Sequence, residues 1–225
     1  MSFSTAWDER YRANTQLSVW PWSDLVSYVM RYARPSGRET AVLELGCGAG
    51  ANIPFFKELG VRYYAVEGSP AIVERLRERF PDLKDNIVVG DFTQEIPLEG
   101  RFDLVADRSS LTHNSDSAIR NCLSLLRARL KEGGSYIGID WFSTAHSDFR
   151  AGKAAEDPYT RRDFESGQFA KVGRVHFSDR AHLEDLFKGF SIETLEHKIV
   201  ERKIPDVAHV FASWNLVARL RHGGS

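Results

Sequence analysis

The chain contains the stretch AVLELGCGAGANIPFF at residues 41–56, and this stretch decides the fold class. Its apolar beginning predicts a short buried strand, the glycines at positions 46, 48 and 50 predict a turn, and the apolar residues that follow predict a helix. A strand, a glycine turn and a helix in this order direct free backbone N–H groups at a ligand, and glycine allows close approach and a positive φ. Glu44 lies second from the turn, within reach of a cationic or hydroxylated ligand.

Length and composition are those of one α/β domain that spans residues 1–225. The formal net charge is −1, with 30 basic and 31 acidic residues, so no nucleic-acid partner is predicted. Cys47 and Cys122 form no C-x-x-C pattern, which argues against structural zinc and disulfides and fits the reducing cytoplasm. The N-terminus lacks the apolar core of a signal peptide, and no apolar run reaches membrane-spanning length, so no membrane partner is predicted.

Strand and helix patterns alternate along the first two thirds of the chain. Apolar runs predict strands at 41–45, 61–66, 86–90, 101–106 and 135–139, and amphipathic segments predict helices between them. This alternation predicts a doubly wound, mostly parallel sheet, whose ligand site lies beyond the carboxyl ends of the strands. Glu67, Asp91, Asp107 and Asp140 all follow predicted strands and therefore become candidate site residues.

The segments outside this alternation carry two further expectations. The arm at 1–22 contains Phe3, Trp7, Tyr11, Trp20 and Trp22, and it either packs on the core or forms a lid over a ligand. Together with the helix predicted from Ser23, this arm occupies residues 1–36. The polar segment 143–177 predicts an insertion over the active site. A helix near 178–189 and two strands at 191–201 and 207–220 complete the chain.

Two side chains have chemistry that the residues alone suggest. Glu67 follows the glycine turn by about twenty residues, where a carboxylate accepts hydrogen bonds from both ribose hydroxyls, in a nicotinamide cofactor as well as in other nucleosides. The alternative for Glu67 is an exposed carboxylate that caps the next helix. His113 is a candidate general base because the ordinary pKa of histidine is close to working pH, and its alternative is a loop histidine that caps a helix.

The motif E-L-G-C-G-A-G resembles motif I of the class I S-adenosylmethionine (SAM) methyltransferases. The resemblance extends over about residues 41–142 and includes A-V-E-G-S, G-D-F, F-D-L-V-A-D and L-K-E-G-G. It implies a Rossmann-like, seven-stranded sheet of order 3-2-1-4-5-7-6, with strand 7 antiparallel and helices on both faces. The G-x-G-x-G spacing departs from the G-x-G-x-x-G fingerprint of dinucleotide-binding proteins, which disfavours a nicotinamide oxidoreductase.

The resemblance also implies which parts of SAM contact which residues. The glycine turn receives the methionine part, Glu67 the ribose, and Asp91 with Phe92 the adenine. The predicted cofactor site contains Glu44, Gly46, Cys47, Gly48, Gly50, Asn52, Glu67, Gly68, Asp91, Phe92, Asp107 and Arg108.

The sequence also contains candidates for catalytic and acceptor-binding residues. Asp107 and His113 are the predicted catalytic pair, with a salt bridge as the alternative for Asp107. The predicted acceptor-binding residues are Trp20, Trp22, Asp140, Trp141 and His146, and core packing is an alternative for Trp141. His146 and His176 lack the spacing of metal ligands, so no metal is assigned, although Asp107 and Asp140 leave open the metal site found in catechol-type enzymes.

The sequence thus predicts an enzyme that transfers a methyl group from SAM to an oxygen or nitrogen of a small polar metabolite, such as a sugar or a natural-product intermediate. Two alternatives stay open: a catalytically silent SAM-binding partner or sensor, and a nicotinamide-dependent oxidoreductase. Either a monomer or a homodimer is compatible with the sequence.

Overall fold

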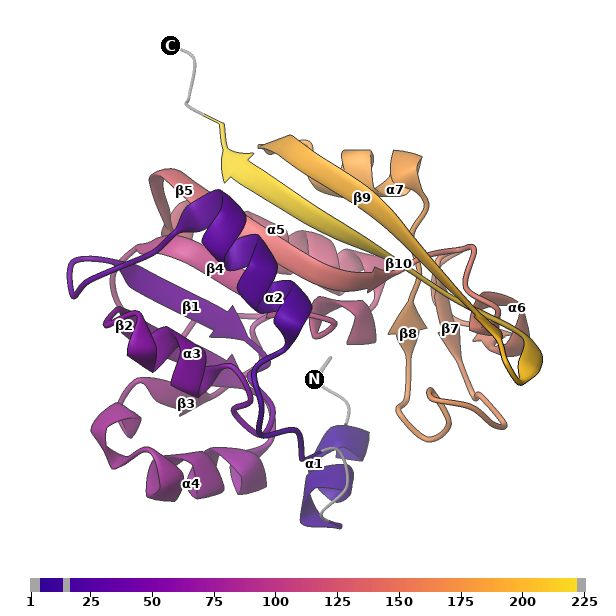
Figure 1. Ribbon diagram of the computed structural model, residues 1–225, viewed down its shortest axis with the longest axis horizontal. Helices are drawn as coiled ribbons and strands as arrows, with labels where there is room; N and C mark the ends of the chain where they lie inside the picture. Colours follow the sequence, from indigo (N-terminus) through magenta and orange to yellow (C-terminus); the bar gives the residue numbers. More distant parts are fainter. Residues whose placement is uncertain (1–4, 14–16, 222–225) are drawn as a thin grey trace.

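The centre of the molecule is a seven-stranded sheet with the order β3-β2-β1-β4-β5-β10-β9 (Figure 1). The computed structural model describes residues 5–13 and 17–221 of the chain. Strand β10 is antiparallel to β5 and to β9, and the other pairs are parallel. The sheet strands are β1 (Ala41–Leu45), β2 (Arg62–Glu67), β3 (Ile87–Val89), β4 (Phe102–Arg108), β5 (Leu130–Phe142), β9 (Phe190–Lys203) and β10 (Asp206–Leu220). With β9 as the sixth and β10 as the seventh strand, the predicted order and the antiparallel seventh strand are confirmed.

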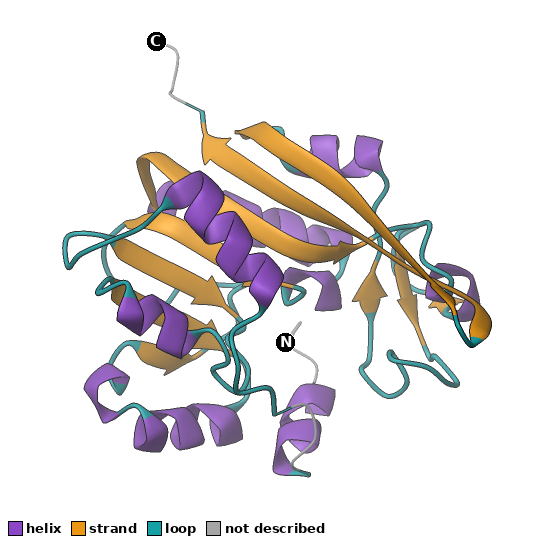
Figure 2. Ribbon diagram, in the orientation of Figure 1, coloured by secondary structure: helices purple, strands orange, loops and turns teal. Residues whose placement is uncertain are grey.

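Helices cover both faces of the sheet, as predicted (Figure 2). Two separate apolar clusters show this: one contains Leu25, Phe56 and Val73, and the other contains Ile119 and Leu183. The helices are α1 (Thr5–Arg12), α2 (Ser23–Tyr28), the π-helix η1 (Val29–Ala33), α3 (Ile53–Glu58), α4 (Pro70–Arg79), α5 (Asp116–Arg129), α6 (Asp148–Ala151) and α7 (Arg180–Leu186), with short 3-10 turns η2 (Pro81–Leu83) and η3 (Leu111–His113). None of the described helices is long and apolar enough to cross a bilayer.

The register of the parallel strands places the site. All five residues of β1 are buried, because the strand lies inside the sheet with helices on either side. Leu45, the last residue of β1, pairs with Val66 of β2 and with Asp107 of β4. The glycine turn, Glu67 and the end of β4 therefore meet at one edge of the sheet.

The segment at 143–177 is more ordered than its polar composition suggests. It contains α6 and a three-stranded antiparallel sheet of β6 (Lys153–Ala154), β7 (Thr160–Arg162) and β8 (Val175–His176). Its core is a third apolar cluster of Phe142, Phe164, Phe169, Val172, Val175 and Phe177. These apolar side chains are spread among polar ones in the sequence, so no periodic pattern reveals the sheet.

The N-terminal arm is described from Thr5 to Ala13 and from Leu17 onward; Phe3 lies outside the described residues. Helix α1 connects two parts of the molecule. Asp8 accepts a hydrogen bond from the hydroxyl of Ser69, at the start of α4, and the guanidinium of Arg10 donates to the carbonyl of Ala170 in the 143–177 segment. The arm thus spans the carboxyl edge of the sheet, where the site lies (Figure 1).

Candidate active site

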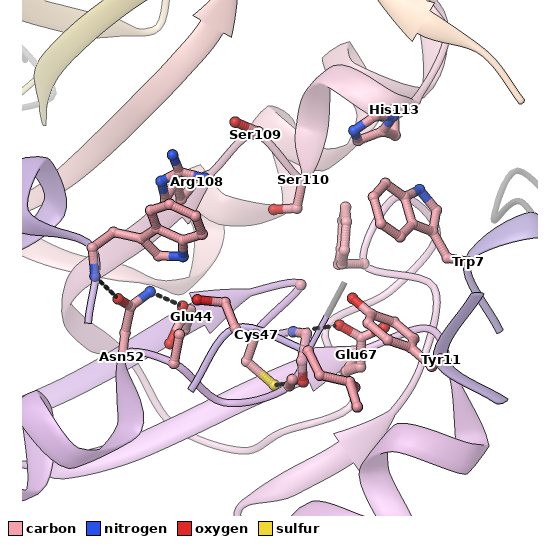
Figure 3. Close-up of a pocket in the computed structure, with 18 of the residues that line it drawn as sticks. Trp7, Tyr11, Glu44, Cys47, Asn52, Glu67, Arg108, Ser109, Ser110 and His113 are labelled. Carbon is pink, nitrogen blue, oxygen red and sulfur yellow. Dashed lines mark hydrogen bonds between the residues drawn. The ribbon is translucent and has the colours of Figure 1, made fainter. Parts of the chain in front are cut away.

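A cavity of about 280 Å³ lies at the carboxyl edge of the parallel strands (Figure 3). Its floor is formed by the glycine turn and the ends of β1, β2 and β4, and its cover by α1 and by residues 17–22. Among the predicted cofactor residues, those that line it are Glu44, Gly46, Cys47, Gly48, Asn52, Glu67, Phe92 and Arg108.

The glycine turn has the geometry that its sequence predicts. Gly46 has a φ of 62° and Gly48 a φ of 52°, in the left-handed region that favours glycine. A Cβ atom on Gly46 would lie 2.5 Å from Cβ of Ser110, and one on Gly48 would lie 2.9 Å from Oη of Tyr11. Side chains at these positions would therefore collide with the walls of the cavity.

Glu67 is held at the end of β2 by two backbone donors. The N–H of Gly48 donates to Oε2 at 2.9 Å, and the N–H of Ser69 donates to Oε1 at 3.0 Å. The side chain lines the cavity although the residue is only 4% exposed. Burial raises the pKa of the Glu67 carboxyl, and these N–H groups oppose the increase. Each oxygen keeps lone-pair capacity for a hydroxyl of a ligand.

Glu44 contributes a second carboxyl group to the floor. Nδ2 of Asn52 donates to its Oε1 at 2.7 Å, and the hydroxyl of Tyr63 donates to its Oε2 at 2.6 Å. Oδ1 of Asn52 in turn accepts the N–H of Trp22 at 3.1 Å, which ties the cover to the floor. Burial raises the pKa of Glu44 to about 7, so the charge of this carboxyl responds to a cationic ligand near neutral pH.

Arg108 forms the wall at the end of β4. Its guanidinium lies 3.6 Å from the centre of the Trp22 ring, and its Nη2 donates to Oδ2 of Asp140 at 2.8 Å. Nε lies 3.7 Å from Oδ1 of Asp24, and it is buried without a hydrogen-bond partner. Arg108 is therefore fixed by aromatic stacking and by charge where it lines the cavity.

Asp140, a predicted acceptor-binding residue, is not among the residues that line the cavity. Its carboxylate is nearly buried and is shared among Arg108, Lys198 and the hydroxyl of Ser213. The strands β9 and β10 supply the last two partners, which are distant in sequence. Asp140 thus holds the guanidinium of Arg108 at the cavity wall.

His113 lies in η3, beyond Ser109 and Ser110, and also lines the cavity (Figure 3). Its Nδ1 is 3.3 Å from the carbonyl oxygen of Arg174. Because a carbonyl only accepts, Nδ1 carries the hydrogen and Nε2 carries the free lone pair. The ring of Trp7 meets the imidazole edge-on at 4.9 Å. Burial lowers the pKa of His113 to about 4, so the ring is neutral at physiological pH.

The structure places Asp107, a predicted catalytic and cofactor-binding residue, outside the lining of the cavity. Its side chain is fully buried and is not among the cavity residues. Oδ1 accepts the N–H groups of Ser110 and Leu111, and Oδ2 accepts the hydroxyl of Tyr136 and the indole N–H of Trp141. Burial raises the pKa of this carboxyl, and the donors oppose the increase. Asp107 therefore holds the loop that leads to His113 and does not face the cavity.

Three predicted acceptor-binding residues also lie elsewhere. Trp141 is fully buried in the core, where its indole donates to Asp107. His146 is buried among the phenylalanines of the 143–177 segment, and its Nδ1 accepts the N–H of Asp148 at 3.0 Å. Trp20 is 80% exposed and does not line the cavity, whereas Trp22 does.

Among the remaining predicted cofactor residues, Gly50, Gly68 and Asp91 are not among the cavity residues. Gly50 packs against α4, where an added Cβ would lie 2.6 Å from Leu76. Oδ1 of Asp91 accepts the N–H and the hydroxyl of Thr93, and the neighbouring Phe92 reaches the cavity instead.

Sequence reasoning missed several cavity residues. The additional ones are Leu17, Ser18, Ala49, Ala51, Ser109, Ser110 and Asn114. Ser109, Ser110 and Asn114 surround His113 in the run S-S-L-T-H-N, and their position directly after β4 was a usable signal. Leu17 and Ser18 follow no strand and carry no such signal.

Comparison with known proteins agrees with this architecture. A family model described as a methyltransferase domain matches residues 42–134. The chain is 30% identical over 70 residues to the 18S rRNA (guanine-N(7))-methyltransferase of Mus musculus, covering 31% of this chain and 24% of that protein. It is 33% identical over 85 residues to the cypemycin N-terminal methyltransferase of a Streptomyces species, covering 38% of this chain and 34% of that protein. The chain thus spans about a quarter to a third of the length of these curated relatives.

A solved structure extends the likeness to nearly the whole chain. The N-methyltransferase NodS from Bradyrhizobium japonicum, in complex with S-adenosyl-L-homocysteine, superposes with a TM-score of 0.61 at 15% identity. The alignment covers 96% of this chain and 88% of that one. A methyltransferase domain model thus matches residues 42–134, and the likeness to NodS shows that the chain as a whole has the same fold.

Proposed function

We propose that this protein transfers a methyl group from SAM to a nitrogen or oxygen of a small polar metabolite. One observation supports this proposal above all. A single cavity joins Glu67 and the glycine turn to Arg108 and His113. A nucleoside-binding floor and a polar acceptor wall therefore share one enclosed space.

The floor fits the chemistry of SAM. The carboxylate of Glu67 lines the cavity, is oriented by two N–H groups, and suits the two vicinal hydroxyls of a ribose. Glu44 places a second carboxyl where a positively charged ligand would favour its ionised form. Phe92 offers an aromatic surface on the same side for a purine ring.

The acceptor wall would position and deprotonate a substrate. SAM, when bound, supplies a methyl group that its positive sulfur already activates, so alignment is the main task of the protein. The indole of Trp22 and the guanidinium of Arg108 would orient the acceptor, and Ser109 and Asn114 offer hydrogen bonds. The unprotonated Nε2 of His113 would take the proton that the acceptor loses.

The size and cover of the cavity favour a small acceptor. In the part of the chain that the structure describes, helix α1 and residues 17–22 lie over the glycine turn, which favours a small acceptor over a polymer. The near-zero net charge also disfavours RNA, the substrate class named for the mouse relative. NodS is an N-methyltransferase by name and the cypemycin enzyme is named an N-terminal methyltransferase, and both names favour a nitrogen acceptor.

Calorimetry with SAM tests the cofactor part, with NADH as the comparison ligand. We expect one SAM per chain and no binding of NADH. A panel of amines, amino sugars, hydroxylated metabolites, RNA and peptides, assayed by release of S-adenosyl-L-homocysteine, then tests the acceptor. Turnover confined to RNA or protein would contradict the small-molecule proposal, and absence of SAM binding would contradict the whole function.

A further inference from the structure

Three potential metal ligands from three separate elements meet outside the cavity. They are His176 of β8, His182 of α7 and Asp116 at the start of α5. The two Nε2 atoms are 3.0 Å apart, and Nε2 of His182 is 3.3 Å from Oδ1 of Asp116. All three ligand atoms lie within 4.8 Å of one another. Both histidines are buried, whereas the side chain of Asp116 is 23% exposed, so the group is accessible from one side.

Hydrogen bonding fixes the tautomer of His176. The hydroxyl of Thr160 lies 2.7 Å from Oδ2 of Asp157 and 3.0 Å from Nδ1 of His176. A carboxylate only accepts, so the single hydroxyl proton goes to Asp157, and Nδ1 of His176 must donate to the hydroxyl oxygen. This leaves Nε2 of His176 as a bare lone pair directed at His182. A hydroxyl and a carboxylate behind the far nitrogen form the outer shell typical of metal-binding histidines.

The spacing agrees with a tetrahedral ion. In a tetrahedral zinc site with bonds of about 2.0–2.1 Å, neighbouring ligand atoms are about 3.3 Å apart. The measured separations of 3.0 Å and 3.3 Å are close to this value. Tyr159 stacks on the ring of His182 at 3.6 Å between centres, which fixes its plane.

The surrounding charge favours a cation. Oδ1 of Asp116 lies 3.3 Å from Nε2 of His182, and Oδ1 of Asp157 lies 4.0 Å from Nδ1 of His176. Arg120 is shared between Asp116 and Asp185, so its charge is largely offset.

A second group of potential ligands consists of His146, Asp148 and His209, but its nitrogen atoms are less available to a metal ion. Nδ1 of His146 accepts the N–H of Asp148 at 3.0 Å, and its Nε2 lies 3.0 Å from the amide of Gln168. Both ring nitrogens are therefore committed to the protein. His209 is 42% exposed in its side chain, and its change provides a matched control.

We propose that Asp116, His176 and His182 bind a zinc-like divalent transition-metal ion, with water as the fourth ligand. The ion joins β8 and α7 to the start of α5, three residues after His113 in the cavity wall. Its role is structural: it fastens the 143–177 segment and α7 to the start of α5, which follows the turn η3 that carries His113. This inference departs from the sequence expectation that the histidines of this segment hold no metal.

The test uses tag-free, full-length protein that has been stripped with a chelator and dialysed. Titration with Zn²⁺ alone in a calorimeter should show one saturable site, and Zn²⁺ should raise the melting temperature. Co²⁺ should give the visible absorption of a tetrahedral complex. His182→Gln should weaken binding more than about 100-fold, since changes in the outer shell alone cost roughly 10–100-fold. Asp116→Asn, at a partly exposed position, is the second variant if His182→Gln does not fold.

The control His209→Gln should bind Zn²⁺ like the parent chain. Absence of saturable Zn²⁺ binding to the parent chain would overturn the proposal, and the two histidines would then be a simple hydrogen-bonded pair. Binding that survives His182→Gln or Asp116→Asn but disappears in His209→Gln would also overturn it. These readouts do not depend on SAM or on turnover, so failure here is distinct from failure of the proposed function.

Discussion

Removal of the Glu67 carboxylate is the sharpest perturbation of the proposed cofactor site. Glu67→Ala would eliminate two hydrogen bonds to ribose hydroxyls, at a cost of about 2–3 kcal/mol in SAM binding. This corresponds to an increase in Kd of about 30- to 160-fold. The substitution also leaves the N–H groups of Gly48 and Ser69 without their acceptors, which lowers the free energy of unfolding by about 2 kcal/mol.

Two further variants separate binding from folding. Glu67→Gln keeps one acceptor oxygen and should weaken SAM binding by about 10-fold. Glu78→Gln, at an exposed position of α4, removes the same charge at a distance and should leave Kd unchanged. Calorimetry measures Kd, and urea unfolding reports on stability. A folded Glu67→Ala protein that binds SAM with parental affinity would refute the ribose assignment.

The other predictions concern the proposed base His113, the carboxyl of Glu44 in the cavity floor and the buried carboxylate of Asp107. His113→Gln should lower turnover by about 100-fold and leave the Kd of SAM unchanged; full activity would remove it as the base. Because the pKa of His113 is about 4, titration of this ring should cause no change in rate between pH 5 and 8. SAM should bind more tightly as pH rises toward 7, because the positive ligand favours ionised Glu44, whose pKa is about 7. In calorimetry, the SAM affinity of Glu44→Gln should not change with pH in this way. Asp107→Asn should reduce the free energy of unfolding by about 2–4 kcal/mol, because an amide NH₂ replaces one acceptor of a buried network, while folded protein keeps its SAM affinity. An inactive Asp107→Asn enzyme of parental stability would restore Asp107 to catalysis.

The sheet was predictable because its signals are local. The strand β1 is buried throughout and apolar at every position except Glu44, and the glycines after it mark the turn. Ser69 is followed by proline at the first helical position and accepts the N–H of Ile72, as its sequence context predicts. The position of Glu67 in the cavity could be predicted from two features of the sequence: Glu67 follows an apolar run, and it lies about twenty residues after the glycine turn.

For the carboxylates near the other strand ends, the sequence did not show which of them face the cavity. Asp107 and Asp140 lie near the ends of β4 and β5 as Glu67 lies at the end of β2, yet only Glu67 lines the cavity. Their partners Tyr136 and Lys198 are 29 and 58 residues away in the chain, so no local pattern shows whether a carboxylate faces the protein or the cavity. The group of His176, His182 and Asp116 is equally non-local, which is why spacing rules for metal ligands do not detect it.

A crystal structure of the protein with S-adenosyl-L-homocysteine tests the central claim most directly. The account predicts the ribose within hydrogen-bond distance of both oxygens of Glu67, and the sulfur directed toward the wall formed by Arg108 and His113. A ligand bound elsewhere, or a ribose that makes no contact with Glu67, would contradict it.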